Sequence, residues 1–200
     1  MRKIIIFAII SLLILSLNIG GCSKRNSDEV EKTRNETEQK TNENLDKSQE
    51  ITEDEYKSLL TKNYEKYLKP IDIKDEKIED LLDKDNNLNN DNIIQNYTNL
   101  LSDSKNNIES FKESISGLKI NNQDLQNLND NLVVLSDKLI EDIIAKQDNL
   151  DYKKEELLNS DKTTLLKYLD DELDVYINSE EAFDDNLEKI ENFLGIDLSK

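Results

Sequence analysis

Residues 125–143, LQNLNDNLVVLSDKLIEDI, form the stretch that decides the fold of this chain. Apolar residues recur there in steps of three and four, at Leu125, Leu128, Leu132, Leu135, Leu139 and Ile143. Such steps place the side chains on one face of an α-helix. The stretch therefore predicts an amphipathic helix, which we expect to extend to about Leu158.

Similar stripes flank this helix on both sides. The stripe before it consists of Ile94, Tyr97, Leu101, Ser104, Ile108, Phe111, Ile115 and Leu118, and Gly117 and the Asn121-Asn122 pair should end its helix. The stripe after it consists of Leu166, Leu169, Leu173, Tyr176, Glu180, Phe183, Leu187, Ile190 and Leu194. Gly195 is placed as the left-handed residue that ends this third helix, with Ile196 as the apolar contact beyond it.

A shorter helical region is expected before these three helices. Thr52 and Glu55 have the spacing of a capping box, and Ile51 and Tyr56 have that of a hydrophobic staple. The only proline, Pro70, should stop the helix that starts here. A weaker helix is expected from about residue 75 to 88, with Ile78, Leu81 and Leu82 inward, and the Asn/Asp-rich residues 85–92 predict a turn.

The predicted fold class is all-α, an antiparallel up-down bundle of about four helices in residues 51–200. Short connections make neighbouring helices antiparallel. Extra apolar residues widen the stripes beyond a two-stranded coiled-coil seam, namely Val133, Ile140, Ile144, Leu165 and Ile177. No strand pattern of useful length appears. An elongated, self-associating coiled coil remains the alternative.

Residues 22–50 form a polar linker in this interpretation. From Ser23 to Glu50 the chain has one leucine, one valine and no aromatic residue. Such a segment cannot bury enough apolar surface to offset its conformational entropy, so we expect it to be disordered. Its root-mean-square reach would be about 30 Å. A helix that continues the body is the alternative, and either form would act as a spacer.

The first 22 residues have the pattern of a secretory signal. Arg2 and Lys3 give a positive start, an apolar run follows from Ile4 to Leu17, and the segment ends in Ile19-Gly20-Gly21-Cys22. The run is too short to span a bilayer comfortably. Cys22 is the only cysteine in the chain, so a disulfide within the chain is excluded.

The ending Ile19-Gly20-Gly21-Cys22 resembles the lipobox of bacterial lipoproteins. This resemblance implies cleavage between Gly21 and Cys22, removal of residues 1–21, and lipidation of Cys22 with palmitate-type acyl chains. It implies a lipid-anchored protein on the extracytoplasmic face of the cell membrane. An ordinary signal peptide with an incidental cysteine is the alternative. The heavy use of Asn, Lys, Ile, Asp and Glu looks like that of an AT-rich genome. The helical body resembles small helical lipoproteins of low-GC Gram-positive bacteria.

The composition argues against several classes of function. The chain has no histidine, which removes the commonest general base and metal ligand. Only Gly117 and Gly195 follow the linker, so a glycine-rich phosphate loop is absent. The formal net charge is −18, and losing Arg2 and Lys3 with the leader would make it −20. Such a charge repels nucleic acid. We expect no enzyme activity, cofactor or metal centre.

Residues 170–185 contain eight acidic residues and no lysine or arginine. The candidate binding residues in this acidic segment are Asp170, Asp171, Asp174, Glu180, Glu181, Asp184 and Asp185. Like charges four residues apart on a helix are destabilising. A docking face for a basic protein segment, or a loose Ca²⁺ site, would explain why the segment carries these acids in spite of their repulsion. The alternative is a solvated face of an acidic protein.

Three smaller features remain open. Glu180 falls where the third stripe calls for an apolar residue, so it pairs with a lysine, opens a groove, or marks a helix break near Asn178-Ser179. Asp83, Asp85 and Asn87 have the first spacing of an EF-hand loop, but Leu88 and Ile94 break the pattern, which favours a polar turn. Most tyrosines lie on the stripes and are expected in or around the core: Tyr56, Tyr64, Tyr67, Tyr97 and Tyr176.

The predicted function is a membrane-anchored, non-enzymatic module for protein–protein interaction at the cell envelope. A cation- or small-ligand-binding lipoprotein is the first alternative. A structural spacer or self-associating coiled coil is the second. The sequence does not name the partner.

Overall fold

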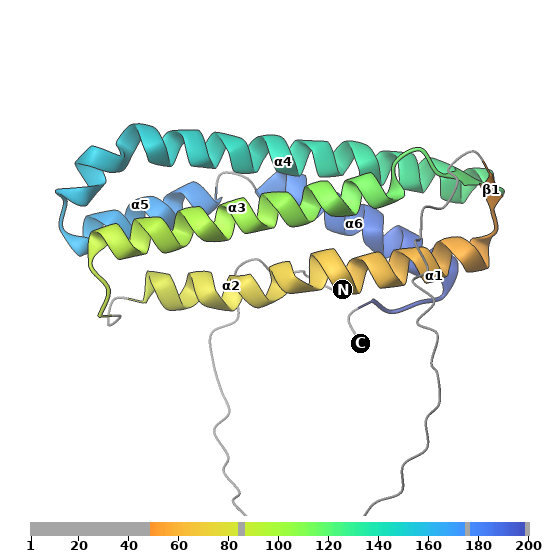
Figure 1. Cartoon of the computed structure of the whole chain (residues 1–200), viewed down its shortest axis with the longest axis horizontal. Helices are drawn as coiled ribbons and strands as arrows, with labels where there is room; N and C mark the ends of the chain where they lie inside the picture. The colour runs from red at the N-terminus through yellow and green to blue at the C-terminus, as the bar shows by residue number, and fades with distance from the viewer. Residues whose placement is uncertain (1–48, 84–86, 175–176, 199–200) are drawn as a thin grey trace, which may run out of the picture. The chain divides into compact units, whose positions relative to one another are not determined.

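The computed structural model describes residues 49–83, 87–174 and 177–198, all of which fall in one compact unit. Its fold class is all-α, as predicted. The helices are α1 (Glu53–Asn63), α2 (Lys69–Leu82), α3 (Asn90–Ile115), α4 (Gln123–Leu158), α5 (Lys162–Asp174) and α6 (Ile177–Leu194), with a π-helical segment η1 (Tyr64–Leu68) between α1 and α2 (Figure 1). The predictions for residues 1–48, including that for Cys22, concern a part of the chain outside the described residues.

The predicted start of α1 is confirmed. Thr52 Oγ1 accepts from the Glu55 backbone N–H at 3.3 Å, and Glu55 Oε2 accepts from the Thr52 N–H at 2.8 Å. These two bonds complete the capping box. The hydrogen bond from the Thr52 backbone, and that from its side chain, hold the pKa of the Glu55 carboxyl below its usual value. Ile51 and Tyr56, the predicted staple, are both buried.

The prediction that Pro70 stops the helix is wrong. Helical structure continues through η1 into α2, where Pro70 is the second residue. Proline has no N–H for the carbonyl four residues earlier, and its ring crowds that carbonyl. Just before Pro70 the ladder widens, because the Lys69 N–H donates to the Tyr64 carbonyl, five residues back. We attribute the uninterrupted helical path to this π-helical widening.

Helix α4 has the predicted extent, whereas α3 begins at Asn90, within the residues expected as a turn, and ends at Ile115, before the stripe residue Leu118. The two helices pack side by side in opposite directions, as the contacts between them show. Asn90 Nδ2 reaches the Leu157 carbonyl at 3.1 Å, and Gln147 Nε2 reaches Ser102 Oγ at 2.9 Å. Near the other end, Lys112 Nζ pairs with Asp137 Oδ1 at 2.6 Å. Helix α6 also packs against α4, and Asn186 Nδ2 donates to the Leu128 carbonyl at 2.9 Å.

The third predicted helix corresponds to two described helices, α5, which ends at Asp174, and α6, which begins at Ile177. Residues 175–176 lie outside the described residues, and Asn178-Ser179, where a helix break was considered, lies within α6. The end of α6 is as predicted: Gly195 has φ of 61°, and the Ile196 N–H donates to the Glu191 carbonyl at 3.0 Å. This is the hydrogen bond of a Schellman motif.

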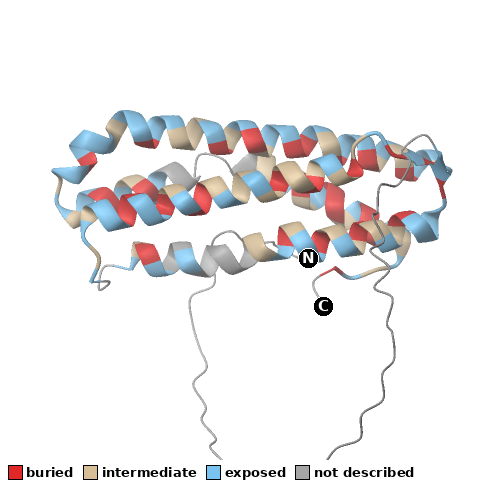
Figure 2. Cartoon of the chain, viewed as in Figure 1, coloured by how far each residue is buried: buried red, intermediate tan, exposed pale blue. Residues whose placement is uncertain are grey.

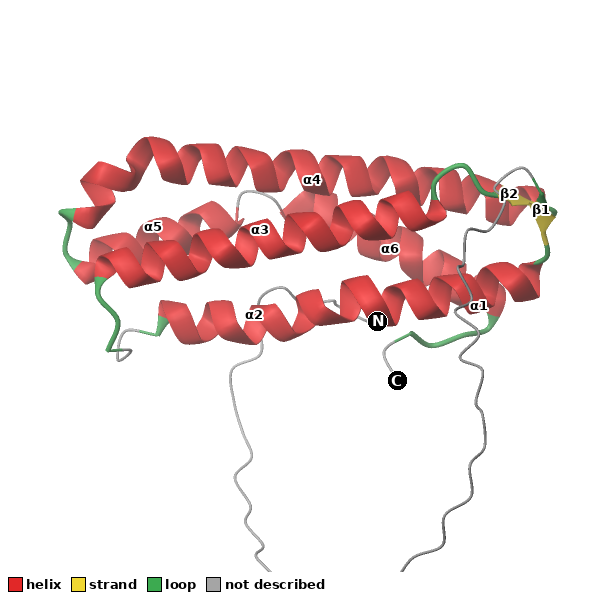
Figure 3. Cartoon of the chain, in the orientation of Figure 1, coloured by secondary structure: helices red, strands yellow, loops and turns green. Residues whose placement is uncertain are grey.

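The structure contains a short parallel strand pair that was not expected from the sequence. Strands β1 (Glu50–Ile51) and β2 (Lys119–Ile120) pair with Ile51 opposite Ile120 (Figure 3). The Asn121 N–H adds a bond to the Ile51 carbonyl at 3.0 Å. Both isoleucines are buried. The strand pair therefore holds the segment just before α1 against the segment that connects α3 to α4.

The core consists of two clusters of buried side chains. Figure 2 shows where buried residues lie along the helices. The first core cluster contains Ile51, Tyr56, Leu60, Phe111, Ile115, Leu125, Leu132, Phe183, Leu187, Ile190 and neighbours. The second core cluster contains Leu81, Ile93, Ile94, Tyr97, Leu101, Ile108, Ile140, Leu150, Leu165, Leu169 and neighbours. Most predicted stripe residues are thus buried. Ile144 was expected inward but is 39% exposed, because it faces away from both clusters.

Candidate functional site

The acidic segment, residues 170–185, spans the end of α5 and the start of α6. Four of its candidate residues are exposed to solvent, namely Asp170, Asp171, Glu181 and Asp185. The side chain of Asp174 lies outside the described residues. Glu181 and Asp185 are one turn apart on α6 and leave like charges together at the surface. The exposed acids can attract a cationic partner.

Glu180 and Asp184 are only partly exposed and differ in this from the other candidates. The Glu180 Oε1 atom is buried. On the preceding residue, Ser179 Oγ donates to Asp142 Oδ2 of α4. The start of α6 is thereby fixed against α4, and Glu180 and Asp184 belong to this packed side of the helix rather than to a solvated acidic face.

The described residues contain no group of three or more His, Cys, Asp or Glu side chains arranged to hold a metal ion. The exposed acids Asp170, Asp171, Glu181 and Asp185 are among the residues that form no such group. Of the EF-hand-like residues, Asp83 and Asn87 are exposed, and Asp85 lies outside the described residues.

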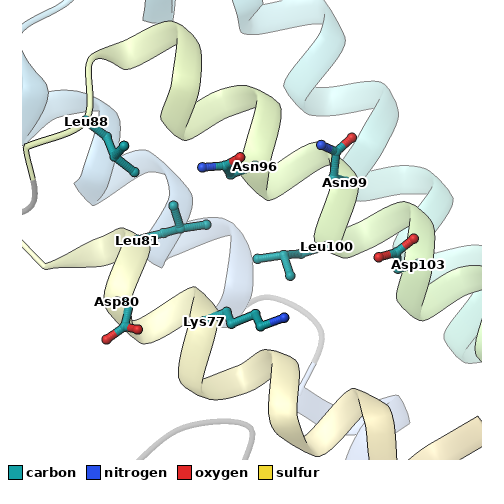
Figure 4. Close-up of a pocket in the computed structure, with 8 residues that line it drawn as sticks. All are labelled: Lys77, Asp80, Leu81, Leu88, Asn96, Asn99, Leu100 and Asp103. Carbon is teal, nitrogen blue, oxygen red and sulfur yellow. The ribbon is translucent and has the colours of Figure 1, made fainter.

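A pocket of about 360 Å³ lies between α2 and α3. Its lining residues are Lys77, Asp80 and Leu81 of α2, Leu88 of the connecting segment, and Asn96, Asn99, Leu100 and Asp103 of α3 (Figure 4). Leu81 was predicted to point inward and is buried. The other lining residues were not predicted as a site, since three of the four on α3 are polar and looked like a solvated helix face.

A buried polar cluster joins three helices at the first core cluster. Tyr56 Oη of α1 donates to Asn129 Oδ1 of α4 at 3.0 Å, and Asn129 Nδ2 donates to the Ile115 carbonyl of α3 at 3.1 Å. Tyr56 and Asn129 are completely buried. Burial raises the pKa of Tyr56, and the negative charge of Asp130 adds to this effect. The phenol therefore stays protonated, and the cluster links α1, α3 and α4 through buried hydrogen bonds.

The other tyrosines mostly follow the prediction. Tyr64 and Tyr97 are buried, and Tyr67 is half-buried with the Lys66 ammonium 4.7 Å from its ring centre. Tyr152 is 86% exposed on α4, and Tyr176 lies outside the described residues. Of the five tyrosines expected in or around the core, Tyr56, Tyr64 and Tyr97 are thus buried and Tyr67 is half-buried.

Comparison with known proteins gives no assignment. No protein-family model matches the chain, and neither the curated proteins nor the solved structures contain a similar one. Among the described residues, no helix combines the length and apolar character needed to cross a membrane.

Proposed function

We propose that this chain is a lipid-anchored extracytoplasmic protein whose helical body binds another protein of the cell envelope without catalysing a reaction. The supporting observation is the N-terminal sequence: a positive start, an apolar run, and Ile19-Gly20-Gly21-Cys22. In this proposal residues 1–21 are removed and Cys22 carries the acyl chains. Two or more chains anchor a protein stably, whereas a single chain binds only weakly.

Metabolic labelling tests the anchor. Cells that express the chain would be fed an alkyne fatty acid, and the purified protein would be probed for the label. We expect labelling and membrane association in the wild type and in Ser23→Ala, and loss of both in Cys22→Ser. Label that persists in Cys22→Ser would contradict lipidation at this residue.

The exposed acids of the acidic segment support a basic partner. Asp170, Asp171, Glu181 and Asp185 lie on a molecule whose formal net charge is −18. Charges of one sign raise the association rate of an oppositely charged partner, and salt weakens this attraction. The proposed contact is a lysine- and arginine-rich segment of an envelope protein.

Crosslinking in intact cells tests this contact with matched variants. The site variant neutralises the four exposed acids as D170N/D171N/E181Q/D185N. The control variant neutralises four exposed acids of α4 as E141Q/D148N/D151N/E155Q. We expect one stoichiometric partner that is lost in the site variant and retained in the control. Equal loss in both variants would show that only the total charge matters.

We also propose that the helices form the antiparallel up-down bundle expected from the sequence, with α1–α2 and α5–α6 each acting as one rod. The hydrogen bonds between α3 and α4, and those between α4 and α6, support this arrangement. A short bis-maleimide should link cysteines placed at Lys112 and Asp137 in a Cys22→Ser background, and fail between Lys112 and Asp151. The reverse result would contradict the antiparallel order.

A further inference from the structure

We propose that the pocket between α2 and α3 binds a small amphiphilic cation, such as a short alkylammonium compound. The pocket volume, about 360 Å³, lies at the lower end of the range of small-molecule sites. Nothing in this inference depends on the lipid anchor or on the acidic segment, because the pocket residues belong to other elements.

The inner wall of the pocket is apolar. Leu81 is 7% exposed and Leu100 is 9% exposed, and both belong to the second core cluster. Leu88, which packs against the same cluster, approaches from the segment that joins α2 to α3 (Figure 4). These three leucines offer a surface on which an alkyl chain of a ligand would lose its contact with water.

The rim of the pocket is polar. Asn96, Asn99 and Asp103 follow one another along α3, at steps of three and four residues that place them on one face. Lys77 and Asp80 stand on α2 across from them. All five are exposed. A ligand therefore meets hydrogen-bonding groups at the mouth and leucine side chains below it, which is the usual arrangement of a small-molecule site.

The charges of the rim select for a cation. Among the lining residues that the structure describes, Asp80 and Asp103 are acidic and Lys77 is basic. The negative field of the whole chain acts in the same direction. An ammonium group can donate hydrogen bonds to the rim carboxylates and amide oxygens, whereas a carboxylate ligand would be repelled. The alkyl chain of the same molecule would lie on the leucines.

Calorimetric titration of the full chain tests the proposal, in nonionic detergent with a ligand-into-detergent blank. The probes are hexylamine, hexanoate and hexanol, which share one alkyl chain and differ in charge. We expect saturable binding of hexylamine, weaker binding of hexanol and none of hexanoate. Equal binding of hexylamine and hexanol, or tighter binding of hexanoate, would overturn the assignment of a cation.

Two variants test the location. D80N/D103N should weaken hexylamine binding about threefold to tenfold, since each exposed charge contributes modestly. The control D148N/D151N removes two exposed acids of α4. It should change the affinity for hexylamine less than twofold. Asn99→Trp should fill the pocket and abolish binding, whereas Asn106→Trp, about two turns further along α3, should not. Unchanged binding in either D80N/D103N or Asn99→Trp, with helicity retained by circular dichroism, would overturn the site.

Discussion

Asn129 is a polar side chain enclosed by helices on a stripe that is otherwise leucine. It lies between Leu125 and Leu132, each about one turn away, and is completely buried like both of them. Its amide satisfies the Tyr56 hydroxyl and one of the last carbonyls of α3, which has no partner within its own helix. A slipped register of α4 would leave all three groups without hydrogen bonds, at a substantial cost. Asn129 therefore favours one alignment of α1, α3 and α4.

Substitutions at Tyr56 and Asn129 should be strongly coupled. We expect Asn129→Ala to lower the free energy of unfolding by about 2–4 kcal/mol, because it opens a cavity and leaves buried partners unsatisfied. Tyr56→Phe should cost about 1 kcal/mol. The double variant should cost less than the sum, as measured by urea unfolding. Strict additivity would show that the hydrogen bond contributes nothing.

The raised pKa of Tyr56 predicts a loss of stability in alkali. An unfolded tyrosine loses its proton near pH 10, whereas the buried phenol keeps its proton to higher pH. The unfolded state then binds fewer protons, so the free energy of unfolding falls as pH rises past about 10. Below that pH both states are protonated and Tyr56 contributes no pH dependence.

Unfolding of the wild type and of Tyr56→Phe between pH 8 and pH 11 measures this contribution. Above pH 10 the wild type should lose up to about 1.4 kcal/mol more per pH unit than the variant. The other tyrosines and the lysines are common to both proteins and cancel in the comparison. Parallel curves would contradict a raised pKa at Tyr56.

At the scale of the elements, signals that are complete within a few residues were predicted correctly. The capping box at Thr52 and the glycine end of α6 are of this kind. The extent of α4 was also predicted, from the helical period of its own apolar residues. Features that depend on distant partners were missed. Strands β1 and β2 have two residues each, too few to show alternation, and they exist because residues 50–51 meet residues 119–120. The pocket depends in the same way on how α2 faces α3.

Pro70 shows why a local rule can fail. The rule assumes a regular α-helical ladder, but η1 already widens that ladder before the proline. We expect Pro70→Ala to change the free energy of unfolding by less than about 1 kcal/mol, because the proline interrupts little regular α-helical hydrogen bonding at this position. Lys138→Pro, in the regular and exposed middle of α4, should cost about 3 kcal/mol or more. Denaturant midpoints of the two variants compare these sites directly. A large increase in the free energy of unfolding of Pro70→Ala would show that the proline strains the helix.

At the scale of the whole molecule, negative charge is the dominant electrostatic feature. The formal net charge is −18, because 44 acidic side chains stand against 26 basic ones. Ion pairs can therefore offset only part of the negative charge. Self-repulsion should therefore outweigh ion pairing in the response of the folded state to salt.

Salt should stabilise the protein. Between about 10 mM and 100 mM NaCl the screening length falls from about 30 Å to about 10 Å, which weakens repulsion between surface acids. We expect the unfolding temperature to rise by roughly 2–4 °C, which corresponds to about 1 kcal/mol for a chain of this size. The variant E141Q/D148N/D151N/E155Q should respond less. A fall in unfolding temperature with salt would show that attractive pairs dominate.

The division of the core into two clusters has a consequence for local opening. Helices α3 and α4 run through both clusters, but among the partly buried side chains that the structure describes, only Ile71 and Leu139 pack against both of them. The two ends can therefore open with different free energies while the rest of the molecule stays folded. In native-state hydrogen exchange, amides of α4 near Leu132 and those near Leu150 should form two separate groups of protection, each shared with the helices packed at its own end. The amides of one helix, α4, would then show two different free energies of opening along its length.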